Sequence, residues 1–155
     1  MSKDDNGGFK QIIRNKKAYF TYEIIEKFEA GIELKGTEVK SLREGRVAMG
    51  DAFAIVRDSE LWLIDLEISA YSHGNINNHE PKRPRRLLMR RSEIKRLYNR
   101  VVERGLTMVP LRMYFNPRGW AKVELAIVKG KTIGDKRETI KKREMERDLK
   151  RQYGV

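Results

Sequence analysis

Residues 106–130, LTMVPLRMYFNPRGWAKVELAIVKG, contain the pattern that decides the fold of this chain. Two largely apolar runs, 106–115 and 120–130, flank the four residues Asn116-Pro117-Arg118-Gly119, and Asn, Pro and Gly are favoured in tight turns. The pattern predicts an antiparallel hairpin. Pro110 has no backbone N–H, so it predicts a bulge or an edge position in the first of these strands.

A second hairpin is predicted upstream, where AFAIVRD and LWLIDLEIS alternate apolar and polar residues on either side of Asp58-Ser59-Glu60. Before it, YFTYEIIEKFEAGIEL at 19–34 alternates over much of its length, which predicts one long strand. The alternation slips at Ala30-Gly31, and a glycine within a strand often marks a bulge, so we expect a bend there. The residues expected to face inward from this strand are Ile25, Phe28 and Ile32.

Two helices are predicted between the strands. The signature TEVKSLREG begins at Thr37, which can cap a helix, and ends at Gly45, giving about two turns. The segment SEIKRLYNRVVERG begins at Ser92 and ends at Gly105. Its apolar residues follow the spacing of one helix face and are Ile94, Leu97, Tyr98, Val101 and Val102. Residues 87–89 are consistent with a short helical turn before it.

Antiparallel hairpins and bent strands with two to three helices favour a mainly β fold with α, an OB-fold-like antiparallel β-barrel, over a sandwich. We assign this barrel to residues 15–130. Residues 1–14 are polar and charged and are expected to form a disordered leader. Residues 72–86 are expected to form a long exposed loop, in which His73 and His79 are polar loop residues.

The composition favours an anionic partner. The chain has 34 Lys and Arg against 22 Asp and Glu, which gives a net charge of +12. Nucleic acid is the usual partner of such a charge, and an anionic membrane surface is the alternative. There is no cysteine, and we find neither a signal peptide nor a long apolar stretch, so we expect a cytoplasmic protein without membrane attachment.

The positive charge is concentrated in two segments. Ten basic and two acidic residues lie in the segment 82–104, and nine basic and five acidic residues lie in the tail, 131–155. These two excesses together equal the whole net charge, and such segregation is typical of a polyanion-binding surface. A solvated helix face remains the alternative for the segment 82–104. Most aromatic residues lie in strand patterns and are expected in the core.

Known catalytic motifs are missing from the sequence. It has no G-x-S-x-G, no H-E-x-x-H and no complete phosphate-binding loop, since Gly130-Lys131-Thr132 lacks the preceding glycine. We therefore expect no enzymatic activity, no cofactor and no metal site. A generic OB-fold RNA-binding protein and an RNA-processing enzyme are the alternatives to a specific RNA-binding adaptor.

Four segments in order carry a resemblance to a known family: NKKAYFTYEIIEKFEAGIELKGTEVKSLREG, HEPKRPRRLL, the hairpin ending in VKGK, and DKRETIKKRE. Together they resemble the SsrA-binding proteins, also called small protein B. The resemblance implies an OB-type barrel that binds the tRNA-like domain of transfer-messenger RNA. It also implies that the protein mimics the missing anticodon arm and delivers this RNA to stalled bacterial ribosomes for trans-translation, that is, ribosome rescue and peptide tagging, as a monomer.

The resemblance also implies which residues bind RNA. Those that match the RNA-binding surface of the family are Asn15, Glu29, Gly31, Glu38, Lys40, Ser41, Arg43, Arg85, Arg86, Leu88 and Arg90. A carboxylate can accept from a base amino group or a ribose hydroxyl, so acidic residues are not excluded from such a surface. For Glu38 a purely structural role in the first turn of a helix is equally favoured.

The tail is implied to enter the decoding centre and the mRNA channel of the ribosome. We expect it to be disordered when free and helical on the ribosome. The residues expected to contact the ribosome are Lys131, Asp135, Lys136, Arg137, Lys141, Lys142, Arg143 and Arg147. Some relatives carry a stacking residue before the DKR motif, and Gly134 cannot stack. Arg90 replaces a neutral polar residue of relatives, which predicts a phosphate contact in place of a specific hydrogen bond.

Overall fold

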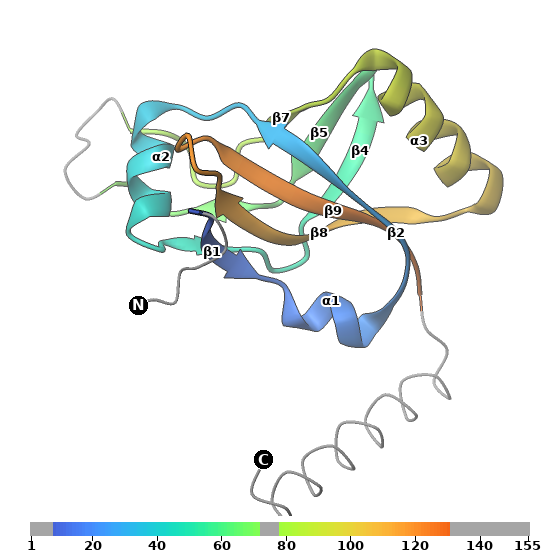
Figure 1. The fold of residues 1–155 in the computed structure, drawn as a ribbon, viewed down its shortest axis with the longest axis horizontal. Coiled ribbons are helices and arrows are strands. Elements are labelled where there is room, and N and C mark those ends of the chain that lie inside the picture. The colour runs from blue at the N-terminus through green and yellow to red at the C-terminus, as the bar shows by residue number, and fades with distance from the viewer. Residues whose placement is uncertain (1–7, 72–77, 131–155) are drawn as a thin grey trace, which may run out of the picture.

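The computed structural model describes residues 8–71 and 78–130 of the chain (Figure 1). In chain order its elements are β1 (Lys10–Arg14), α1 (Lys16–Thr21), β2 (Tyr22–Ile32), α2 (Gly36–Arg43), β3 (Val47–Ala48), β4 (Phe53–Arg57), β5 (Glu60–Ile64), β6 (Glu67–Ile68), β7 (Arg85–Leu88), α3 (Arg91–Arg104), β8 (Thr107–Phe115) and β9 (Ala121–Gly130). No helix among these residues is long and apolar enough to cross a membrane.

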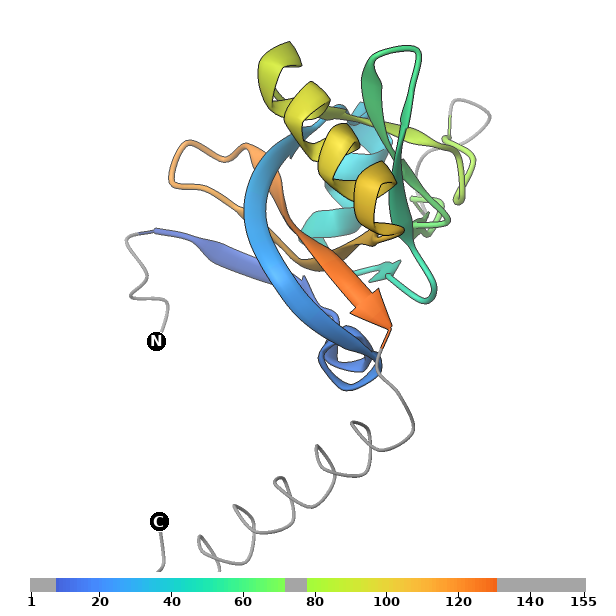
Figure 2. The ribbon, with the colours of Figure 1, turned by 90° about the vertical axis from the view of Figure 1, so that its right-hand side faces the viewer.

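The main sheet closes on itself. Its strand order is β1-β8-β4-β5-β7-β2-β9, and β8 also pairs with β9, so the strands from β8 round to β9 form a ring. All these pairings are antiparallel. Figure 2 shows β2 curving around this ring and α3 lying across one side of it. The predicted mainly β, OB-fold-like barrel with flanking helices is therefore confirmed.

The hairpin of β8 and β9 forms as predicted. The pairing register shifts between Pro110 and Arg112, which is the bulge that Pro110 predicts. In the turn, the side-chain oxygen of Asn116 accepts from the backbone N–H groups of Arg118 and Trp120 at 3.1 and 2.9 Å. Gly119 has a φ of +84°, a conformation that glycine adopts without steric cost.

The long strand predicted over 19–34 differs from the structure in two respects. Residues 16–21 form α1, and the bulge of β2 lies between Ile24 and Glu26, not at Ala30-Gly31. A bulge places two residues opposite one and shifts the alternation of faces. For this reason Ile25, which is expected to face inward, is 38% exposed, whereas Ile32 is buried and Phe28 packs partly against the core.

Two further segments pair as strands where the sequence predicts none. Residues 10–14 are expected in a disordered leader, but they form β1 and pair with the free edge of β8, and Ile12 and Ile13 pack against the core. Residues 85–88 are expected partly in a loop and partly in a helical turn, but they form β7. This strand pairs with both β5 and β2 and so joins the two halves of the ring.

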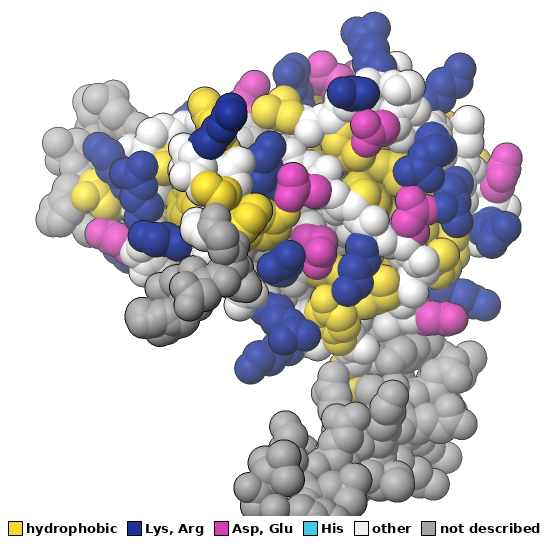
Figure 3. Space-filling view, viewed as in Figure 1, with side chains coloured by type: hydrophobic (Ala, Val, Ile, Leu, Met, Phe, Trp, Pro, Cys, Tyr) yellow, Lys and Arg dark blue, Asp and Glu magenta, His cyan; other side chains and the backbone are white. Residues whose placement is uncertain are grey.

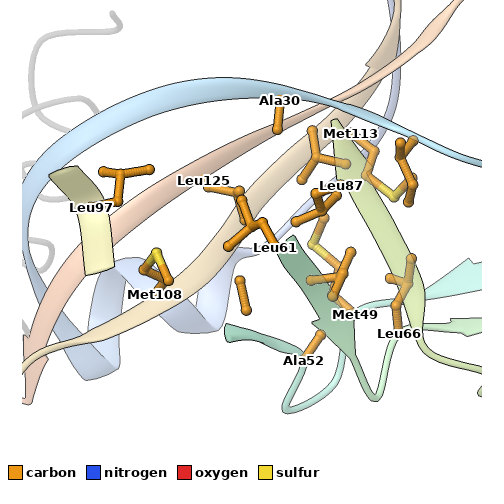
Figure 4. Close-up of a cluster of buried hydrophobic side chains, with 14 of the residues drawn as sticks. Ala30, Met49, Ala52, Leu61, Leu66, Leu87, Leu97, Met108, Met113 and Leu125 are labelled. Carbon is orange, nitrogen blue, oxygen red and sulfur yellow. The ribbon is translucent and has the colours of Figure 1, made fainter. Parts of the chain in front are cut away.

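The core fills the interior of the ring (Figure 4). Leu61, Leu87, Met113 and Leu125 from four strands meet there, and α3 adds Leu97 over one opening. A smaller cluster packs α1 against the outside of β8 and β9. The expectation that most aromatic residues of the strand patterns lie in the core holds only in part: Tyr19, Tyr22, Phe28 and Phe115 are partly buried and pack against the two clusters, Tyr114 is buried outside them, and Trp120 is 66% exposed.

Candidate nucleic-acid interface

A buried ion cluster joins α2 to the segment that leads into β7. The Glu38 carboxylate accepts from Arg85 Nε at 2.7 Å and from Arg83 Nε at 3.0 Å. The side chains of Glu38 and Arg85 are both 0% exposed. Three further donations from Arg85 reach the carbonyl oxygens of residues in two loops, at 2.6 to 3.1 Å: Leu66, Pro81 and Arg83. The cluster therefore holds the segment 80–85 against α2.

The charged state of this cluster is stable. Burial alone raises the pKa of Glu38, but hydrogen bonds from Arg83 and from the backbone N–H of Lys35, with the positive charge of Arg85, outweigh it and hold the pKa below its ordinary value. Burial lowers the pKa of Arg85, and the charge of Glu38 opposes that change. A guanidinium stays protonated in proteins, so both groups remain ionised at neutral pH.

This burial changes the interpretation of four residues that match the RNA-binding surface of the resembled family. Glu38 and Arg85 are inside the protein, where neither reaches a phosphate. Asn15 is also buried: its Oδ1 accepts from Ala18 N and its Nδ2 donates to Pro110 O, which caps α1 and ties it to β8. Ser41 is buried and donates to Ser69 O at 2.8 Å. These four side chains position backbone and do not face solvent.

Contacts of His79 also hold the segment before β7 against α2. Thr37, which is expected to cap α2, lies inside the helix, and Lys35 is the residue that precedes its first turn. The Thr37 hydroxyl is 2.9 Å from His79 Nδ1, and His79 Nε2 is 2.8 Å from Ile68 O. His79 is thus a buried structural residue, whereas His73 lies outside the described residues.

The outward side of the sheet brings together two rows of polar side chains, which we call the outer sheet face. Directly opposed residues on neighbouring strands point to the same side of a sheet. By this rule one row runs Arg14, Arg112, Glu124, Glu29 across β1, β8, β9 and β2. The next row runs Gln11, Tyr114, Lys122, Gly31 and ends at Leu88 of β7.

Side-chain contacts order this face. The Tyr114 hydroxyl donates to the Glu29 carboxylate, and the Arg112 guanidinium lies 4.7 Å from the centre of the Tyr114 ring. Arg112 Nε also pairs with Glu124 Oε1 at 3.3 Å. Glu29 and Gly31 match the RNA-binding surface of the resembled family, whereas Arg112 and Lys122 of the same face were not predicted from the sequence. Charged residues at outward positions of strongly apolar strands were the signal, because such strands need a polar side only where they meet water or a ligand.

Gly31 is buried, and Leu88 and Lys122 lie close against it. A Cβ atom added there would lie 3.3 Å from Leu88 Cβ and 3.7 Å from Lys122 Nζ. Leu88 itself is 44% exposed, which is unusual for a leucine in a strand that closes a barrel. Glu29, Gly31 and Leu88, which match the RNA-binding surface of the resembled family, therefore lie close together, and the exposed Arg90 follows Leu88 by two residues.

The remaining matched residues lie outside the two rows of this face. Lys40 and Arg43 are exposed on α2. This helix lies at the end of the molecule opposite to α3 (Figure 1). Lys40 Nζ is 5.6 Å from the centre of the Tyr71 ring. Arg86 is half-exposed and pairs with Glu60 at 3.1 Å. All eight tail residues, from Lys131 to Arg147, lie outside the described residues.

Half of the basic residues in the segment 82–104 form ion pairs within the protein. Glu38 pairs with Arg83 and Arg85. Glu60 pairs with Arg86, and Glu26 pairs with Arg96 and Arg100. The exposed cations of this segment that form no ion pair within the described part of the chain are Lys82, Arg90, Arg91, Lys95 and Arg104. Figure 3 shows Lys and Arg spread over the visible face among fewer Asp and Glu.

Comparison with known proteins gives one family. The family model of the SmpB protein matches residues 12–154. An SsrA-binding protein of Trichodesmium erythraeum is 51% identical over 152 residues, covering 97% of each chain. One from Moorella thermoacetica is 56% identical over 142 residues, covering 92% of each. A chain of the solved structure described as "tmRNA-SmpB: a journey to the center of the bacterial ribosome" has a TM-score of 0.66 at 47% identity, covering 83% of this chain and 93% of that one.

Proposed function

Because the chain belongs to the SmpB protein family, we propose that it is an RNA-binding adaptor of trans-translation. It binds the tRNA-like domain of transfer-messenger RNA, stands in for the anticodon arm that this RNA lacks, and delivers it to stalled ribosomes in the bacterial cytoplasm. The chemistry of peptide tagging belongs to the RNA and the ribosome. The protein contributes shape, charge and placement.

The outer sheet face is the observation that carries the proposal. Arg14, Arg112 and Lys122 supply positive charge for phosphates, and Glu29 offers acceptor oxygens to ribose hydroxyls or base amino groups. Gly31 is itself buried, and its lack of a side chain lets Leu88 and Lys122 lie close against β2 and present their outer surfaces to the RNA. A surface that combines these groups suits a folded RNA better than a uniform row of cations.

The buried residues of the matched set act on this surface indirectly. Glu38 and Arg85 hold the segment 80–85 on α2, and β7 continues from that segment to Leu88 and Arg90. Arg86, Arg90, Lys40 and Arg43 remain accessible and supply phosphate contacts around the face. The matched residues thus divide into a buried frame and an exposed contact set.

The tail provides the second RNA-directed surface of the proposal. Its nine basic and five acidic residues, including the DKR motif at 135–137, follow directly after β9. We assign to it contact with ribosomal RNA at the decoding centre and in the mRNA channel. The barrel would thus bind transfer-messenger RNA and the tail would bind ribosomal RNA, so the chain acts as an adaptor between the two.

Binding measurements test the proposal. Purified full-length chain is titrated with a transcript of the tRNA-like domain, with a tRNA and with an unrelated hairpin of equal length, at one fixed salt concentration. We expect the tRNA-like domain to bind at least about tenfold more tightly than the unrelated RNA. Equal affinities for all three would reduce the function to general RNA binding and refute the assignment.

A further inference from the structure

A groove lies between the turn of the β4–β5 hairpin and α3, apart from the residues matched to the family's RNA-binding surface. Its volume is about 520 Å³, enough for one nucleotide. Val56 and Ile94, which pack against the barrel core, form its apolar floor. Arg91, Lys95 and Tyr98 of α3 line one side, and Asp58 and Ser59 of the hairpin turn line the other.

The helix places unlike side chains on this groove in a regular order. Arg91, Lys95 and Tyr98 are spaced at i, i+4 and i+7, which puts them on one stripe of α3. The neighbouring stripe, with Ile94 and Leu97, is buried. Tyr98 is 47% exposed, so it adds little to the core although its position fits the apolar periodicity of the helix.

The opposite side of the groove is polar and conformationally unusual. Asp58 and Ser59 have φ values of +52° and +64°. A two-residue hairpin turn of this kind favours Asn and Gly, and positive φ is uncommon for serine. The chain keeps two side chains with hydrogen-bonding oxygens at a place where glycine would be less strained. Strain of this kind is typical of functional positions.

We infer that this groove seats one unstacked nucleotide of the tRNA-like domain, with its base on the Tyr98 ring. Arg91 and Lys95 contact the flanking phosphates, and Asp58 and Ser59 hydrogen-bond the edge of the base. Aromatic stacking with adjacent cations is how proteins bind unpaired bases. The apolar floor accepts the face of a base and the two cations lack ion partners within the described residues, which favours an anionic ligand.

Continuity identifies the RNA. Arg90 is the residue that precedes α3, and Arg91, the first residue of the helix, lines the groove. The groove therefore begins at the residue that follows Arg90, the last residue of the proposed contact set in the chain. The inference rests on the proposed function, because it assigns the nucleotide to the same RNA that the outer sheet face binds.

Matched variants of the full-length chain test the inference by affinity for the tRNA-like domain at fixed salt. We expect Tyr98→Ala to weaken binding by roughly fivefold to a hundredfold, the range found for one stacked base, and Tyr98→Phe to retain it within about twofold. Val102→Ala, one turn further along α3 and 60% exposed, removes apolar surface outside the groove and should leave affinity unchanged. Lys95→Ala should flatten the salt dependence by about one phosphate contact, whereas Arg104→Ala should not.

A second readout locates the base. Ultraviolet irradiation of the complex should cross-link the peptide containing Tyr98 to a single unpaired nucleotide of the tRNA-like domain. If the wild-type chain prefers this RNA but Tyr98→Ala binds it equally well and no cross-link forms, the groove inference is wrong while the proposed function stands. If Tyr98→Ala impairs only ribosome engagement, the groove belongs to another partner and the inference is equally refuted. Loss of preference in the wild type itself would contradict the proposed function.

Discussion

Replacing Arg85 by methionine should destabilise the fold without removing a phosphate contact. Methionine keeps most of the length of the stem but has no guanidinium. The Glu38 carboxylate would remain 0% exposed with Arg83 as its remaining basic partner. The carbonyl oxygens of Leu66 and Pro81 would each lose the Arg85 guanidinium as a donor, although the backbone N–H of Ile68 would still donate to Pro81 O. Removing one member of a buried ion pair costs about 3–5 kcal/mol, because the other charge is left uncompensated.

This loss is large relative to the stability of a domain. Total unfolding free energies are about 5–15 kcal/mol, so the variant would lose between a fifth and all of its stability. Each kcal/mol lowers the Tm of a domain of about this size by about 2–4 °C. We therefore expect a fall in Tm of about 6–20 °C for Arg85→Met.

Urea unfolding of the full-length chain, followed by tryptophan fluorescence, measures the effect. Arg86→Met is the matched control, because Arg86 is the next residue in β7 and its pair with Glu60 is about two-fifths exposed on each side. An exposed pair contributes about 0–1 kcal/mol, so the control should unfold close to the wild type. The double variant Glu38→Gln with Arg85→Met should regain part of the lost stability, since no buried charge remains.

The salt dependence of RNA binding decides between the two roles of Arg85. For a buried frame residue, folded Arg85→Met should keep the wild-type slope of log affinity against log salt. A phosphate contact would instead lower the slope by about 0.9, as we expect for the exposed Arg90→Ala. Unchanged stability together with a flattened slope for Arg85→Met would show that the reasoning from burial is wrong.

Three further changes to the chain have expected effects on stability, RNA binding or tagging. The folded pKa of Glu38 lies below its ordinary value of 4.5, so the contribution of Glu38 to the unfolding free energy is present above pH 4.5 and is lost as the pH falls through the folded pKa. The Glu38→Gln variant should therefore lose less unfolding free energy than the wild type between about pH 6 and pH 3, which urea titration measures. Gly31→Val should weaken binding of the tRNA-like domain at least about fivefold, because the added side chain would displace Leu88 and Lys122, which cover Gly31; unchanged affinity would show that the positions of these two side chains do not matter for RNA binding. Truncation after Gly130 should leave that affinity within about threefold and abolish tagging on stalled ribosomes, and loss of RNA binding would contradict the division between barrel and tail.

Local patterns of the sequence account for the elements that form correctly. The β8–β9 hairpin depends on a turn and on alternation within 25 residues, and α3 depends on apolar spacing and a terminal glycine. Gly105 indeed ends the helix with a φ of +62°. These predictions are correct because the residues on which they depend are close together in the chain.

The candidate site was predictable only in part. Glu29, Gly31 and Leu88 match the family's RNA-binding surface and lie close together, but the sequence offered no means of separating them from Glu38 and Arg85, which match it too and are buried. Both sets contain charged residues in polar stretches, and their exposure depends on which segment packs over them. The sequence places Tyr98 on the apolar face of α3 because its spacing is correct, and its distance from the barrel cannot be read from the spacing.

What the sequence determined by itself is the class of the molecule: a mainly β barrel with an amphipathic helix, an excess of positive charge in two segments, and a family resemblance carried by four motifs. Only the tertiary structure decided that residues 10–14 and 85–88 are strands, and that Arg85 faces inward while Arg112 and Lys122 face outward. The physical reason is that periodicity is local, whereas strand pairing, bulges and burial depend on contacts between residues far apart in the chain.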